Sequence, residues 1–176
     1  MRRIAWIFVL ALVVALVPAM ADNWSWTFTD TSGLVVASGT LSGSSFGGGG
    51  GFNITSGGIT DNLYGSGTIF PNPSPGAVGL SPGGTTNYDN LLFPGTDPLV
   101  DNWGLLFVGP AHEYNIYSNT APITYLKFVG TTGSGGSGPD DVGTFAIVST
   151  PDGGTTLALL GLALVGLAGI RRKLSL

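Results

Sequence analysis

The middle of the chain, residues 22–150, alternates between apolar and polar residues over short stretches. In the first stretch Trp24, Trp26 and Phe28 occupy every second position, with Ser and Thr between them. Successive side chains of a strand point to opposite faces, so this pattern predicts a strand with one buried face. Residues 30–33, Asp-Thr-Ser-Gly, are typical of a turn, and residues 34–37 are predicted to return as the second strand of a hairpin.

Further short strands are predicted along the same region. They cover residues 52–54, 63–70, 91–93, 105–108, 114–117, 123–129 and 145–148. Gly, Pro, Asn and Asp turns separate them, and no convincing helical period occurs between them. We therefore predict an all-β domain over residues 22–149, with a β-sandwich or jelly-roll-like architecture.

The amino end has the three parts of a secretory signal peptide in the correct order. Two arginines follow Met1, residues 4–17 are uniformly apolar, and Ala19 and Ala21 form a small-x-small cleavage site. An uncleaved membrane anchor is the alternative, but an apolar run of 14 residues is short for a membrane span. We predict that signal peptidase removes residues 1–21.

The carboxyl end also has three parts. They are Pro151, Asp152, Gly153 and Gly154, then uncharged residues 155–170, then the basic residues Arg171, Arg172 and Lys173. As a helix, residues 155–170 would measure about 24 Å at about 1.5 Å per residue, against a bilayer core of about 30 Å. The sequence therefore predicts a short transmembrane helix with a cytoplasmic basic stop, which places the central domain on the far side of the membrane.

This arrangement resembles the PEP-CTERM class of bacterial sorting signals, in particular its VPDSG-type variant. Thr150 stands where the variant usually has Val, and Gly153 stands where it usually has Ser. The resemblance implies recognition by an exosortase, an integral-membrane protease or transpeptidase of bacteria that make extracellular polymeric substance. It implies an exported protein that is first tethered to the inner membrane and later lies at the cell surface or in the extracellular matrix.

Charge restricts the partners of the central domain. Residues 22–150 contain nine acids and one base, Lys127, for a net charge of −8. A domain charged in this way repels phosphate backbones, so nucleic acid is not an expected partner. Extracellular polysaccharide and divalent cations remain compatible with it. The chain has no cysteine, which excludes disulfides and thiol catalysis.

Several acids fall in turns and are candidates for chemistry. They are Asp89, Asp97, Asp101, Asp140 and Asp141. We favour hydrogen bonding to the local backbone as their role, because Asp side chains commonly stabilise turns in this way. Calcium binding by Asp89, Asp97 and Asp101 is an alternative, and a glycosidase-like carboxylate pair is a further one. The regular Asp-x-Asp-x-Asp-Gly loop is absent, so no cofactor is predicted.

No catalytic constellation stands out. His112 and Glu113 suggest a base and its orienting partner, but no nucleophile elbow and no cysteine accompany them. Residues 133–138 satisfy Gly-x-Gly-x-x-Gly, but a strand rather than a helix is predicted to follow, so we interpret them as a loop. The sequence therefore predicts a protein that is not an enzyme.

Two functions remain open. The first is a structural or adhesive protein of the cell surface or the biofilm matrix. The second is a carbohydrate-binding β-sandwich in which aromatic side chains stack on sugars. The candidates for that role are Trp24, Trp26, Trp103, Tyr64, Tyr88, Tyr114, Tyr117 and Tyr125. Aromatic residues in strands more often belong to the core, which favours the first function.

Overall fold

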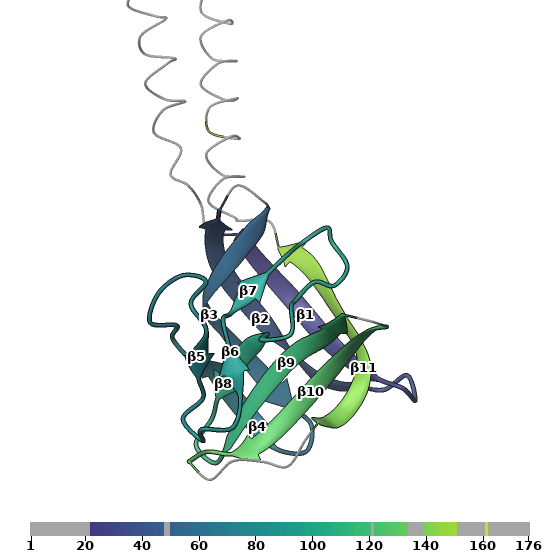
Figure 1. Ribbon diagram of the computed structural model, residues 1–176. Helices are drawn as coiled ribbons and strands as arrows, with labels where there is room; N and C mark the ends of the chain where they lie inside the picture. Colours follow the sequence, from purple (N-terminus) through teal and green to yellow (C-terminus); the bar gives the residue numbers. More distant parts are fainter. Residues whose placement is uncertain (1–21, 48–49, 121, 134–138, 151–160, 162–176) are drawn as a thin grey trace, which may run out of the picture.

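The computed structural model describes residues 22–47, 50–120, 122–133, 139–150 and 161, and within them the chain forms eleven strands. They are β1 (Asp22–Asp30), β2 (Val35–Phe46), β3 (Gly51–Asp61), β4 (Gly65–Ile69), β5 (Gly79–Leu80), β6 (Asn87–Tyr88), β7 (Leu91–Leu92), β8 (Leu105–Val108), β9 (His112–Thr120), β10 (Ile123–Thr131) and β11 (Pro139–Thr150). The all-β prediction is confirmed for this part of the chain (Figure 1).

The predicted terminal segments lie almost entirely outside the residues that the structure describes. The signal peptide over residues 1–21 lies outside the described residues, as does all of the predicted helix over residues 155–170 except Gly161. In the described part, no helix has the length and apolar character needed to cross a membrane.

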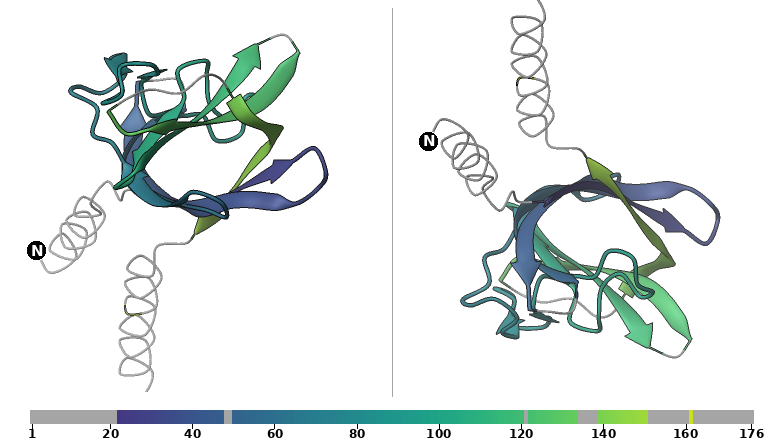
Figure 2. Two further views of the ribbon diagram at one scale, coloured as in Figure 1. Left: turned by 90° about the horizontal axis from the view of Figure 1, so that it is seen from below. Right: turned by 90° about the horizontal axis from the view of Figure 1, so that it is seen from above.

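Eight of the described strands form one closed antiparallel sheet, seen along its axis in Figure 2. The order around the ring is β1, β2, β3, β4, β8, β9, β10, β11 and back to β1. Strand order therefore follows chain order, and the chain leaves the ring only between β4 and β8. Closure pairs both edges of every ring strand, which removes the exposed edges of an open sheet.

This architecture corrects the prediction of a β-sandwich or jelly roll. The β2–β3 pairing runs from Ala37 opposite Asp61 to Phe46 opposite Gly51, and the β1–β11 pairing joins the first described strand to the last. One continuous ring therefore replaces two separate sheets. Register shifts in β1, β2 and β10 mark bulges, which bend strands and help a sheet to curve.

Glycine allows the β2 and β3 backbones to approach closely. A Cβ added to Gly39 would lie 1.8 Å from the carbonyl oxygen of Gly58 on β3. Only glycine fits at this position, because any side chain would collide with the backbone of the neighbouring strand.

The barrel interior is filled by apolar side chains. Trp24, Trp26 and Phe28 point inwards from β1, as their alternation predicts, and all three are buried. The Trp26 ring centroid lies 5.5 Å from that of Phe107 and 5.7 Å from that of Phe145, which brings three strands together. The interior is thus a packed core.

Residues 70–104, here named the outer layer, lie partly over the outer face of β8 and β9, whereas Leu92 and Val100 of the same segment pack into the barrel core. Asn90 joins the outer layer to β8. Its Nδ2 donates to the carbonyl of Phe70 at 2.8 Å, and its Oδ1 accepts from the N–H of Leu106 at 2.9 Å. Leu106 points out of the barrel between the inward-facing Leu105 and Phe107, yet it is fully buried. The outer layer therefore shields a second apolar surface.

The predicted strand boundaries agree with the observed ones at some strands and differ at others. The prediction over residues 105–108 coincides with β8, whereas β2 extends from Val35 to Phe46 and far beyond the predicted residues 34–37. Its Gly- and Ser-rich half has low strand propensity, and pairing on both sides holds it in the ring. Leu63 and Tyr64, predicted as strand, lie in a turn where Asp61 Oδ1 accepts both of their N–H groups.

Candidate functional site

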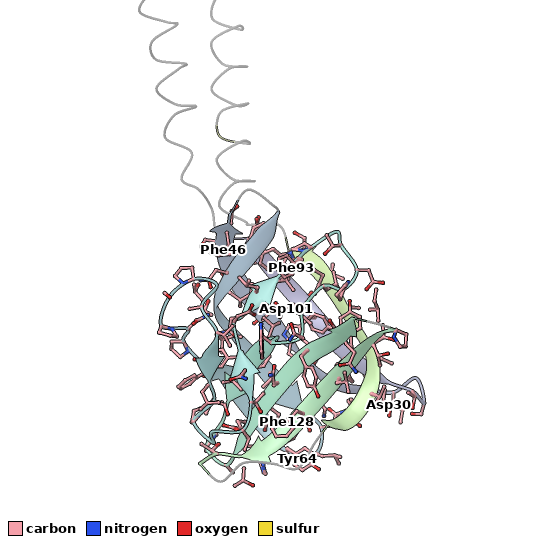
Figure 3. The ribbon with its side chains drawn as sticks, in the orientation of Figure 1. Asp30, Phe46, Tyr64, Phe93, Asp101 and Phe128 are labelled. Atoms are coloured by element: carbon pink, nitrogen blue, oxygen red, sulfur yellow. The ribbon has the colours of Figure 1, made fainter. Side chains whose placement is uncertain are left out.

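An open pocket of about 280 Å³ lies where the outer layer meets the outer face of the barrel. It is lined by Thr85, Thr86, Asn87, Asn102, Trp103, Asn115, Tyr117 and Phe128. Asn115 of β9 and Phe128 of β10 are register partners, so they share the outer face of the sheet. Figure 3 labels Phe128 on this side of the barrel.

Asn115 is the central polar group of the pocket and is only 1% exposed. Its Nδ2 donates to the carbonyl oxygens of Asn87 at 3.0 Å and Trp103 at 2.9 Å, which fixes the outer layer against β9. Its Oδ1 has no hydrogen-bond partner among the described residues. A buried acceptor without a partner is unfavourable, so this oxygen lowers the stability of the contact between the outer layer and β9.

Two of the predicted calcium ligands, Asp89 and Asp101, lie together in the outer layer. Burial, together with the charge and a hydrogen bond of Asp101, raises the pKa of Asp89 to about 7. Asp89 Oδ1 accepts the N–H of Leu91 at 3.1 Å, and Asp101 Oδ1 accepts those of Trp103 and Gly104 at 2.9 and 3.1 Å. These are the backbone contacts that the turn interpretation predicts.

The third predicted ligand, Asp97, makes a different contact. Its Oδ1 accepts a hydrogen bond from the hydroxyl of Tyr125 at 2.9 Å, and its side chain is exposed. The described residues contain no group of three or more His, Cys, Asp or Glu side chains placed to hold a metal ion. Calcium binding therefore stays a prediction, now restricted to Asp89 and Asp101 with backbone or solvent oxygens.

A buried charged cluster occupies one end of the barrel interior. Lys127 of β10 is 1% exposed and forms ion pairs with Asp61 and, at 2.9 Å, with Asp141 of β11. Burial opposes the ammonium charge, but the hydrogen bonds and charges of the two carboxylates outweigh it, and the pKa of Lys127 is raised. The Tyr64 ring centroid lies 6.0 Å from Lys127 Nζ, and Figure 3 labels Tyr64 at the lower end of the barrel.

His112 and Glu113 do not form a base and its orienting partner. They are consecutive in β9, so their side chains point to opposite faces of the sheet. Glu113 is fully buried beneath the outer layer, where Oε1 accepts the hydroxyl of Ser81 and Oε2 accepts the N–H of Gly83, both at 3.0 Å. The His112 ring instead lies beside Tyr64, with centroids 5.2 Å apart.

The aromatic candidates divide into three groups. Most of them are buried, namely Trp24, Trp26, Tyr88, Tyr114 and Tyr125. Trp103 and Tyr117 are half-buried in the pocket, and Tyr64 is 39% exposed near the charged cluster. The core interpretation thus holds for five of the eight, and two others face a cavity.

Sequence reasoning missed Asn115 and the pairing of Lys127 with Asp61. One signal pointed to Lys127, because it stands between Tyr125 and Val129 on the apolar face of its strand. No sequence pattern marks Asn115, because its role depends on the outer layer folding back over β9.

Residues 151–174 match the VPDSG-CTERM motif. The C-terminal segment is a sorting motif. It implies export, membrane-anchored sorting and processing by an exosortase-type system. The matched range includes the predicted sorting residues 151–154 and the basic residues 171–173, whose structure, like that of Ala19 and Ala21, lies outside the described residues.

The match does not extend to the barrel. A search of curated proteins found no match to the chain, and a search of solved structures found none either. The function of the barrel therefore has to be argued from its own residues.

Proposed function

We propose that this chain is a non-enzymatic structural or adhesive protein of the cell surface or extracellular matrix, delivered by exosortase-type processing. The sorting motif, which begins directly after β11, carries the proposal. Strands β1 and β11 are antiparallel neighbours, so the first and last described residues of the domain leave the barrel at the same end. A tether at that end leaves the sides and the opposite end of the barrel accessible to other molecules.

The contacts of five acidic side chains in the described residues support a structural role. Asp61 and Asp141 pair with Lys127, and Glu113 holds the outer layer. Asp89 and Asp101 stabilise turns. Each of these carboxylates thus has a structural contact.

Localisation of the full-length chain tests the proposal in a host that has the exosortase, and in the same host without it. We expect a processed form beginning at Asp22 and ending near Asp152 outside the cells, and an uncut membrane-bound form without the exosortase. A matched variant, Asp152→Ala, is expected to resemble the exosortase-deficient host. A full-length protein in the cytoplasm would contradict the proposal.

The pocket favours a second function, binding of extracellular polysaccharide. Trp103 and Tyr117 line it together with several Thr and Asn residues, and a site for sugars combines aromatic side chains with polar groups of this kind. The surface around the pocket is not basic, since the only base of residues 22–150 is buried. A neutral polysaccharide is therefore the expected ligand.

A glycan array distinguishes the two functions. If the pocket binds sugar, the wild-type chain retains defined glycans and Trp103→Ala loses them, while Tyr64→Ala, which removes an aromatic ring that does not line the pocket, binds normally. Arrays run with and without a chelator show whether calcium contributes. Absence of binding by the wild-type chain leaves the structural role and rejects the second function.

A further inference from the structure

We propose that Lys127 and Asp61 condense to form an intramolecular amide bond across the barrel interior, with Asp141 as the proton-transferring group. The two residues are 66 positions apart and belong to β10 and β3. These strands are four steps apart in either direction around the ring, so they are opposite each other. A bond between them would join opposite walls of the barrel.

The nucleophile and its electrophile are already in contact. Lys127 Nζ touches Oδ2 of Asp61, and both side chains are shielded from solvent. Burial of a contacting pair gives it a high effective concentration, because little orientational freedom remains to be lost. The same burial protects the amide product from hydrolysis.

The backbone turn after β3 activates the Asp61 carboxyl group. Its Oδ1 accepts the N–H groups of Leu63 and Tyr64 at 2.9 and 3.0 Å. When Nζ adds to Cγ, negative charge collects on Oδ1, and these two fixed donors stabilise it as an oxyanion hole does. They also fit the product, in which Oδ1 is the amide oxygen.

Asp141 supplies the proton transfers. Its Oδ2 lies 2.9 Å from Lys127 Nζ and its side chain is 26% exposed, so it stays close to the nucleophile while bordering solvent. It passes one proton from Nζ to Oδ2, which frees the lone pair and makes Asp61 a neutral carboxylic acid, and after Nζ has added to Cγ it passes a second Nζ proton to Oδ2, so that this oxygen leaves as water.

The reaction balances without a further reactant. An ammonium and a carboxylate become one neutral amide and one water: the Nζ–Cγ bond forms, and Oδ2 leaves with two protons that came from Nζ. A buried ion pair is thereby replaced by an uncharged group, which removes the desolvation penalty of two charges. The chain has no cysteine, so this bond would provide the crosslink that disulfides provide elsewhere.

Trypsin tests the proposal directly, because Lys127 is the only lysine or arginine between residues 22 and 150. The full-length chain is expressed with export, folded, incubated, denatured and digested, and mass spectrometry searches for a peptide that begins at Phe128. An amide at Nζ blocks cleavage. We therefore expect no such peptide from the wild-type chain, and instead one uncut peptide that contains both Asp61 and Lys127 and is lighter than its linear sequence by one water.

Variants separate this bond from an ion pair. Asp61→Ala and Asp141→Asn are expected to restore cleavage after Lys127, and Asp30→Asn, which alters another turn-capping carboxylate, is expected to remain uncut. Complete cleavage of the wild-type chain after Lys127 overturns the proposal. Resistance to cleavage that persists in Asp61→Ala overturns it as well, because the block would then have another cause.

Discussion

Asn23 on β1 is the register partner of Thr150 on β11, so the two described ends of the domain lie side by side. The pairing continues to Asp30 opposite Gly143, which makes β11 a full wall of the ring. The predicted signal peptide and the sorting motif are therefore joined in sequence to two strand ends that lie side by side. Closure of the ring depends on the last strand, which is synthesised last.

Because residues 23 and 150 are register partners, we expect the domain to tolerate circular permutation. A short Gly/Ser linker from residue 150 to residue 22, with new ends between Gly47 and Gly50, is expected to give a folded barrel with a similar melting temperature. The new ends fall at the turn between β2 and β3, where no ring pairing is lost. Circular dichroism and thermal unfolding provide the measurement. A control chain that stops before β11 is expected not to fold, and an unfolded permutant would contradict the prediction.

A second prediction concerns the close approach of β2 and β3. Gly39→Ala is expected to lower the free energy of unfolding by about 3 kcal/mol or more, because the new Cβ collides with the backbone carbonyl of Gly58. Chemical denaturation measures the change. Gly58→Ala is the matched control: its Cβ would meet only the carbonyl oxygen of Gly67 at 3.5 Å, an ordinary contact. Equal losses in both variants would show that the collision is not the cause.

The pocket residue Asn115 gives a third prediction. Asn115→Asp replaces a side-chain donor to two carbonyl oxygens with a buried carboxylate that repels them. We expect a loss of about 2 to 4 kcal/mol in unfolding free energy. Asn119→Asp, on the same strand but exposed, is expected to change it by less than about 0.5 kcal/mol. A wild-type stability for Asn115→Asp would contradict the role given to this side chain.

The fourth prediction is a pH dependence of stability. Burial and the neighbouring Asp101 raise the pKa of Asp89 to about 7, whereas an Asp in an unfolded chain titrates near about 3.9. Between these values the folded state holds a proton that the unfolded chain has released. The stabilising contribution is therefore complete below pH of about 4 and is lost as the pH rises to about 7.

Thermal unfolding measured from about pH 4 to about pH 8, a range that includes both titrations of Asp89, gives the dependence of stability on pH. Asp89→Asn keeps the acceptor for Leu91 and removes the charge, so we expect a flatter profile and a gain of about 1 to 3 kcal/mol above the upper titration. Asp97→Asn controls for loss of one exposed negative charge. A wild-type slope in Asp89→Asn would assign the dependence to other groups.

The same experiment tests the calcium prediction. Above the upper titration, calcium bound between Asp89 and Asp101 would offset their repulsion and raise the melting temperature by mass action. The increase should disappear with a chelator and in Asp89→Asn. An unchanged melting temperature in the presence of calcium would reject this site.

The sequence by itself determined the class of fold, most strand positions and the sorting motif. Period-two alternation identifies a strand such as β1 because only neighbouring residues are involved, and the C-terminal motif is a linear arrangement that a family comparison also finds. The turn role of Asp89 and Asp101 was equally local, since each caps N–H groups within three residues.

Tertiary structure alone decided the closed ring, the pocket and the charged cluster. Alternation shows that a strand has a buried face, but it does not show which strands pair, so a sandwich and a barrel have the same local pattern. Asn115 meets Trp103, and Lys127 meets Asp61, only after distant segments fold together. Contacts of this kind depend on the register and closure of the whole sheet, which no short stretch of sequence contains.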